Sequence, residues 1–115
     1  MRLPAFLAAM LLVATPALAA QPADAVYACT RGGNAIGDIE IAGATLRSRT
    51  PGGEFGESLD YMMLDDVSMY LLSEPEILTA GGYRVDNVKV TELGFDVTVL
   101  AEGASEFEIV SCTAG

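Results

Sequence analysis

Two cysteines, Cys29 and Cys112, are the only ones among the 115 residues of the chain, and they lie near its opposite ends. In an oxidising compartment an even number of cysteines indicates disulfide bonding, and two cysteines allow only one pairing within the chain. Such a bond would close a loop of about 84 residues and stabilise the fold by about 4.5 kcal/mol in the chain-entropy model. We therefore expect one disulfide that joins the N- and C-terminal strands, and no catalytic thiol.

The first residues predict export to a compartment in which that bond can form. Arg2 precedes an apolar run over residues 5–14, and the triplet Ala17-Leu18-Ala19 follows. A positive charge, a short apolar segment and an A-x-A site in this order are typical of a secretory signal peptide. We predict that residues 1–19 form the leader and that residues 20–115 form a single periplasmic or secreted domain. The apolar run is shorter than the roughly 20 residues of a membrane-spanning helix, so no membrane span is expected after cleavage.

The mature chain is strongly acidic. The formal net charge is −10, and removal of Arg2 with the leader makes it −11. A field of this sign repels phosphate backbones and anionic lipids, so nucleic acid is excluded as an expected partner. A cationic protein is the partner that this charge favours, and no cofactor is expected.

Short apolar runs, separated by clusters of glycine, proline, aspartate and serine, predict an antiparallel all-β domain of about eight strands. Because the disulfide would tie the first strand to the last, we expect a small β-barrel or a sandwich, since closure leaves no bare strand edge. The longest irregular stretch, Thr50 to Glu57, is expected to form a mobile surface loop.

The most regular hairpin follows a four-residue loop after Val90. This loop places Val90 opposite Phe95 on the apolar face and Lys89 opposite Asp96 on the solvent face. In the residues that precede Val88, the alternation of apolar and polar residues is shifted by one position. We therefore predict a β-bulge at Asp86-Asn87, which restores the apolar face.

The next hairpin is expected to have a five-residue loop over residues 102–106. That loop places Phe107 opposite Ala101 and leaves Val110 and Cys112 on the second, partly apolar face. Something should then cover this second face near the disulfide.

An earlier hairpin is expected to turn at Ala42-Gly43. The pairing then sets Ile39 opposite Leu46 and Asp38 opposite Arg47. Both pairs are favourable, because one is apolar and the other joins opposite charges.

Residues 59–72 fit two structures. A hairpin that turns at Asp65-Asp66 pairs Met62 with Met69 and Tyr61 with Tyr70. A helix competes, because several apolar residues also recur at helical spacing, but other apolar residues would then lie on its polar side. We favour the hairpin.

The residue types present exclude most catalytic chemistry. The chain has no histidine, and therefore no ready general base near neutral pH and no imidazole metal ligand. Asp65 and Asp66 are a carboxylate pair, but adjacent residues on a strand point to opposite faces and cannot converge on one bond. The pair therefore fits a turn better than a small carboxylate hydrolase, and we do not expect an enzyme.

Two groups of residues are candidates for binding. Oxygen ligands for Ca²⁺ could come from five acidic residues, Glu54, Glu57, Asp60, Asp65 and Asp66, although the chain has no EF-hand pattern. Tyr61 and Tyr70 could form an aromatic ligand face if they lie opposite each other.

Tyr27-Ala28-Cys29 opens the mature domain and Val110-Ser111-Cys112 closes it. This frame resembles the periplasmic inhibitors of C-type lysozymes, which are small stapled β-barrels. That family's pattern includes a tryptophan and a lysine-bearing loop that enters the cleft of the enzyme, whereas this chain has no tryptophan and has Lys89 as its single lysine. We expect a non-enzymatic binding or interaction module. The alternatives are an inhibitor of a cationic cell-wall hydrolase such as a lysozyme, and a Ca-binding envelope protein.

Overall fold

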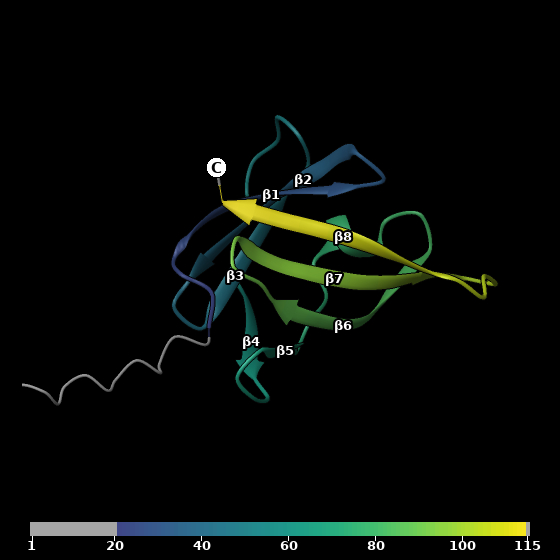
Figure 1. Cartoon of the computed structure of the whole chain (residues 1–115). Helices are drawn as coiled ribbons and strands as arrows, with labels where there is room; N and C mark the ends of the chain where they lie inside the picture. Colours follow the sequence, from purple (N-terminus) through teal and green to yellow (C-terminus); the bar gives the residue numbers. More distant parts are fainter. Residues whose placement is uncertain (1–20, 115) are drawn as a thin grey trace, which may run out of the picture.

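Strands account for most of the chain that the structure describes (Figure 1). The computed structural model describes residues 21–114. Its elements are β1 (Ala25–Arg31), β2 (Asn34–Ala42), β3 (Thr45–Arg49), β4 (Leu59–Met63), β5 (Ser68–Leu71), α2 (Glu76–Thr79), β6 (Tyr83–Val90), β7 (Gly94–Ala101) and β8 (Phe107–Ala114). Each strand pairs with the next and β8 pairs with β1, so the eight strands form a closed antiparallel barrel. The predicted all-β class is confirmed. Of the two architectures that the sequence predicted, a small barrel and a sandwich, the barrel is correct.

The predicted signal peptide, residues 1–19, lies outside the described residues, as does the predicted cleavage point after Ala19. Within residues 21–114, no helix combines the length and the apolar character that crossing a membrane requires.

A single apolar core fills the barrel. Its buried side chains come from every strand and from α2, and they are Tyr27, Cys29, Ile39, Ile41, Leu46, Tyr61, Met69, Ile77, Leu78, Val88, Phe95, Val97, Val99, Val110 and Cys112. No polar or charged residue of the described chain is fully buried. Because burial of apolar surface is the dominant favourable term in folding, this interior serves stability. The charged side chains of residues 21–114 are therefore all at least partly exposed.

The predicted disulfide is confirmed. Cys29 of β1 lies directly opposite Cys112 of β8, and the two sulfurs are bonded across a sequence separation of 83 residues. Both cysteines are completely buried. The bond therefore secures, from inside the core, the seam at which the barrel closes.

The predicted register of the β6–β7 hairpin is also confirmed. Val90 pairs with Phe95 and Lys89 with Asp96, and the register shifts between Val85 and Asn87, where the bulge was expected. The extra residue in β6 keeps the apolar side chains before and after it on the same, inward face.

The predicted register of the β7–β8 hairpin is wrong by one residue. Phe107 pairs with Leu100 and not with Ala101, and Val97 pairs with Val110. A shift of one residue moves every side chain to the other face. Val110 and Cys112 therefore point into the core, which the disulfide to the inward Cys29 requires, and Phe107 is exposed.

The β2–β3 hairpin turns one residue later than predicted. Arg47 pairs with Glu40, Arg49 with Asp38 and Leu46 with Ile41. The predicted pairings of Asp38 with Arg47 and of Ile39 with Leu46 are therefore both wrong by two residues. The turn is set by Gly43, whose φ of 63° is a left-handed conformation that suits glycine. In this register each of these two residue pairs, Arg47 with Glu40 and Arg49 with Asp38, forms an ion pair. A shift of two residues preserves the faces, so the predicted core positions in this hairpin are correct.

The segment over residues 59–72 is a hairpin, as favoured, but its register differs by one residue. Met62 pairs with Tyr70, and Tyr61 pairs with Leu71. The carboxylate of Asp65 accepts hydrogen bonds from the backbone N–H groups of Val67 and Ser68, at 2.9 and 2.8 Å. This side-chain capping lengthens the turn, because Asp side chains hydrogen-bond backbone groups two or three residues on. The predicted pairing of Tyr61 with Tyr70 is therefore wrong.

The ladders around the barrel differ greatly in length. The β6–β7 and β7–β8 ladders contain seven pairs each, whereas β3–β4 and β5–β6 contain two pairs each. The connection from β3 to β4 is the predicted irregular stretch after Arg49. Between β5 and β6, the short helix α2 packs against β2, β3 and β6 and buries Ile77 and Leu78. This helix contacts one strand of each two-pair ladder, β3 and β6.

Candidate functional site

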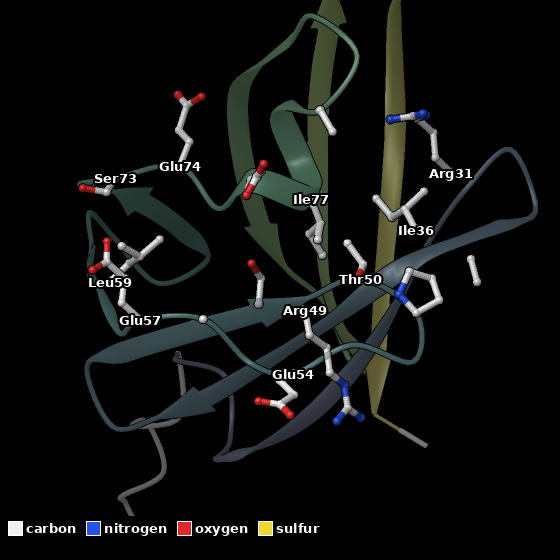
Figure 2. Close-up of a pocket in the computed structure, with 16 residues that line it drawn as sticks. Arg31, Ile36, Arg49, Thr50, Glu54, Glu57, Leu59, Ser73, Glu74 and Ile77 are labelled. Atoms are coloured by element: carbon white, nitrogen blue, oxygen red, sulfur yellow. The ribbon is translucent and has the colours of Figure 1, made fainter.

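A cleft of about 790 Å³ lies beside α2 (Figure 2). Its apolar lining includes Ile36 of β2, Leu59 of β4 and Ile77 of α2, and the irregular stretch after Arg49 forms one wall. In Figure 2, Ile77 projects from α2 between Ile36 on one side and Leu59 on the other. Cavities that hold small ligands are usually of about 300–1,000 Å³ and mostly apolar. The cleft is therefore large enough for a small ligand or for a side chain of a partner.

Gly37 allows the elements around the cleft to come together. The β1–β2 register shifts between Cys29 and Thr30, so that Ile36 is an extra residue in β2. Gly37 follows this bulge with a φ of 141°. A Cβ atom on Gly37 would lie 2.1 Å from the carbonyl oxygen of Arg49 and 3.1 Å from Cγ2 of Ile77. Only glycine leaves room for β3 and α2 to approach β2 this closely.

Two arginines line the cleft, and both are already paired. Nε of Arg49 donates to Asp38 at 2.8 Å, and its guanidinium lies 4.3 Å from the centre of the Phe55 ring. The guanidinium of Arg31 lies 4.1 Å from the centre of the Tyr83 ring, and its Nε is 3.8 Å from Oε1 of Glu108.

Four glutamates, which we call the rim glutamates, also line the cleft: Glu54, Glu57, Glu74 and Glu76. Among the three ion pairs of residues 21–114, none includes a rim glutamate. Glu74 has one polar contact, a long hydrogen bond of 3.5 Å from the backbone N–H of Val85. Since carboxylates pair with both arginines and no ion pair within residues 21–114 includes a rim glutamate, the cleft combines apolar side chains with a negative edge.

The structure does not gather the five acidic residues that were candidates for Ca²⁺. Glu54 and Glu57 lie at the cleft, Asp60 lies on β4, and Asp65 and Asp66 lie in the β4–β5 turn. Within the described part of the chain, no three acidic or cysteine side chains form a group that could hold a metal ion. The two backbone N–H donors of Val67 and Ser68 hold the pKa of Asp65 below its usual value, so this carboxylate acts in the turn.

The two candidate tyrosines lie on opposite faces of the barrel wall. Tyr61 is buried, and its hydroxyl donates to the carbonyl oxygen of Gly43 at 2.7 Å. Burial raises the pKa of Tyr61, and the nearby Asp24 and Tyr27 raise it further. Tyr70 points outward and is half exposed. The two rings therefore form no joint ligand face.

The single lysine has a structural position. Lys89 lies on β6 opposite Asp96, as predicted, and its Nζ donates to Oγ of Ser68 on β5 at 2.8 Å. The pair with Ser68 supports the short β5–β6 ladder. Lys89 is therefore on a strand and not on a loop of the kind found in the lysozyme inhibitors.

Sequence reasoning missed the cleft. Its walls come from segments far apart in the chain, which only barrel closure brings together. Two signals point toward it: the long irregular stretch after Arg49, and Ile77, an apolar residue between two strands that no hairpin uses. Comparison with protein-family models, with curated proteins and with solved structures finds no match to this chain.

Proposed function

We propose that this protein is a non-enzymatic binding module of an oxidising, extracytoplasmic compartment, and that the cleft beside α2 holds a ligand with an apolar body and a positive charge. The observation that carries the proposal is the combination, in one hollow, of apolar walls and the four unpaired rim glutamates. An apolar pocket supplies binding free energy in proportion to the surface it buries. The rim glutamates supply the preference for a cation.

The chemistry available favours binding over turnover. The chain has no histidine, and the disulfide uses both cysteines. Asp65, the candidate general acid or base, accepts hydrogen bonds within its own turn. The buried disulfide supports the proposed compartment, because such bonds persist where the surroundings are oxidising.

The charge preference can be tested with three amphiphiles of equal chain length, used below their micelle concentrations: dodecyltrimethylammonium, dodecyl maltoside and dodecyl sulfate. We expect isothermal titration calorimetry to show the tightest binding for the cationic compound, with an affinity that falls as salt rises. Equal or tighter binding of dodecyl sulfate would refute the proposal.

A matched pair of triple variants locates the binding. The cleft triple variant carries Glu54→Gln, Glu57→Gln and Glu76→Gln, and the control carries Glu92→Gln, Glu102→Gln and Glu106→Gln. Both remove the same total charge, but only the first removes it from the cleft. We expect the cleft triple variant to bind dodecyltrimethylammonium about tenfold more weakly, as loss of close ion pairs in water predicts. The control should retain binding within about twofold.

Inhibition of a cationic cell-wall hydrolase is a second candidate. The observations that favour it are the stapled barrel and the acidic charge, both of which fit a basic enzyme as partner. The test is the activity of a C-type lysozyme, measured at low salt with an excess of the purified protein. Undiminished activity would remove this candidate and leave the cleft proposal intact.

A further inference from the structure

Five large apolar side chains are exposed together on the outer side of one hairpin, and we call them the β4–β5 apolar face. They are Met62, Leu64, Val67, Tyr70 and Leu72, and between 47% and 61% of each residue is accessible to solvent. They fall within eleven consecutive positions of the chain. A soluble protein rarely leaves so many large apolar groups adjacent on its surface unless the surface binds something.

The register of the hairpin creates this face. Met62 lies directly opposite Tyr70, and the backbone N–H of Leu72 donates to the carbonyl oxygen of Asp60 at 3.1 Å. Directly opposite side chains on one face of a sheet are within contact distance, so Met62 and Tyr70 adjoin each other, and Leu72, the residue after β5, follows Tyr70 on the same face. The face is therefore built by the same turn at Asp65 that sets the register, and it is not a set of scattered residues.

The hairpin that carries the face is attached to the barrel by short ladders. Only two residue pairs join β3 to β4, and two join β5 to β6. In Figure 1 the tip of the hairpin projects beyond β6 and β7 at one side of the barrel. A partner can therefore approach the outer surface of both strands.

Charge decides what kind of partner fits. Asp60 precedes Met62 on the same outward face, and Asp65 and Asp66 lie at the tip of the hairpin. None of these three aspartates takes part in an ion pair within residues 21–114. Lys89 lies opposite Ser68 at the other edge of β5, and its ammonium donates to Oγ of Ser68.

An acidic border around an apolar surface disfavours two other occupants. A second copy of this chain would bring two acidic borders and two strongly negative proteins together, and an anionic membrane would repel the same aspartates. We propose that the β4–β5 apolar face docks a basic amphipathic segment of another protein, whose apolar side covers Met62, Tyr70 and Leu72 and whose cations meet the bordering aspartates. This surface shares no residue with the lining of the cleft, so the two proposals are independent.

The probe for the test is a short synthetic amphipathic peptide of leucine and lysine, added to the isotopically labelled folded protein at low salt. We expect changes in the amide NMR signals of β4, β5 and their turn, and no binding of the matched peptide in which glutamate replaces lysine. Binding of the glutamate peptide with equal affinity, or signal changes confined to other strands, would overturn the proposal.

Two sets of variants make the test specific. Met62→Ser, Tyr70→Ser and Leu72→Ser together should weaken peptide binding at least about tenfold, because they remove most of the apolar surface. Phe107→Ser with Ile109→Ser is the matched control, since these β8 residues are equally exposed, and it should bind within about twofold. Equal losses in both would overturn the proposal. Dispersed amide spectra verify that each variant is folded.

A charge variant keeps the test decisive if the apolar triple variant fails to fold. Asp60→Asn with Asp66→Asn leaves every apolar side chain in place and should also weaken binding of the leucine–lysine peptide. The cleft triple variant should leave that binding unchanged. Two results would identify a different occupant: neutral phosphatidylcholine vesicles that shift the same β4–β5 signals, or a dimer in sedimentation that the apolar triple variant dissociates. Either result would overturn the proposal.

Discussion

The two sides of the barrel are built differently. From β6 through β7, β8 and β1 to β2, each junction between neighbouring strands contains five to seven residue pairs, and the disulfide lies within this region. The β4–β5 hairpin is held to its neighbours by two pairs on either side. Both proposed binding surfaces involve this hairpin, because the cleft includes Leu59 at its base and the apolar face lies on its outside. The apolar face thus lies on the side with the short ladders, whereas the cleft is lined from both sides, by Leu59 of β4 and by Ile36 of β2.

Removal of the disulfide, which lies on the side with the long ladders, should have the largest effect on the stability of the barrel. Replacement of both Cys29 and Cys112 by Ala should lower the free energy of unfolding by about 4 kcal/mol, because the cross-link no longer restricts the unfolded chain. Urea denaturation followed by circular dichroism measures this loss. A loss below about 1 kcal/mol would show that the long ladders alone hold the barrel closed.

Hydrogen exchange should distinguish the two sides directly. We expect the amides of β7 to exchange only through global unfolding, and those of β4 and β5 to exchange about 100-fold faster through local opening of the hairpin. The measurement is native-state exchange followed by NMR. Uniform protection of all strands would mean that the short ladders are no weaker than the long ones.

Replacement of Gly37, the glycine beside the cleft, should show how closely β3 and α2 pack against β2. Gly37→Ala should cost about 2–3 kcal/mol, because its Cβ would overlap the carbonyl oxygen of Arg49 and press on Ile77. Gly33→Ala is the matched control, since Gly33 also has a positive φ but has nothing within 4 Å of the added atom, and it should cost about 1 kcal/mol. Thermal unfolding compares them, and equal costs would remove the role assigned to close packing.

The smallest effect should be a dependence on pH at the tip of the hairpin. The pKa of Asp65 is lowered in the folded protein by the N–H groups of Val67 and Ser68. The stabilisation is therefore complete above the ordinary aspartate pKa and is lost as pH falls through the lowered value. Asp65→Asn should flatten the decrease in stability below about pH 4. An unchanged acid profile would show that the carboxylate does not stabilise the turn.

On the side with the long ladders, the sequence pattern predicts the register of the β6–β7 hairpin correctly and that of the β7–β8 hairpin wrongly. Only one loop length places Val90 opposite Phe95 and Lys89 opposite Asp96, so the pattern leaves a single register. In β8 two alternating sets compete, because Phe107 is apolar on one face and Val110 on the other. Cys112 decides between them, since its bond to the inward Cys29 requires it to face the core.

The β4–β5 hairpin could not be derived from apolar alternation. Its register depends on a hydrogen-bonded turn at Asp65, and the pairing of apolar residues is equally good one residue away. The cleft escapes prediction for a different reason, because Ile36, Leu59 and Ile77 are brought together only by the closed barrel. Among its residues, the irregular stretch with Glu54 and Glu57 was identified, although for Ca²⁺ and not for an amphiphilic ligand.

The pairing of β1 with β8 also bears on how the chain is made. Synthesis delivers Cys29 first and Cys112 only 83 residues later, so the ring cannot shut until nearly all of its strands have emerged. A chain that stops before β8 would keep the free thiol of Cys29 and would leave the backbone N–H and C=O groups of β1 unpaired on that side. Molecular chaperones can detect both features. Formation of this one disulfide therefore marks a chain in which both β1 and β8 have been synthesised and paired.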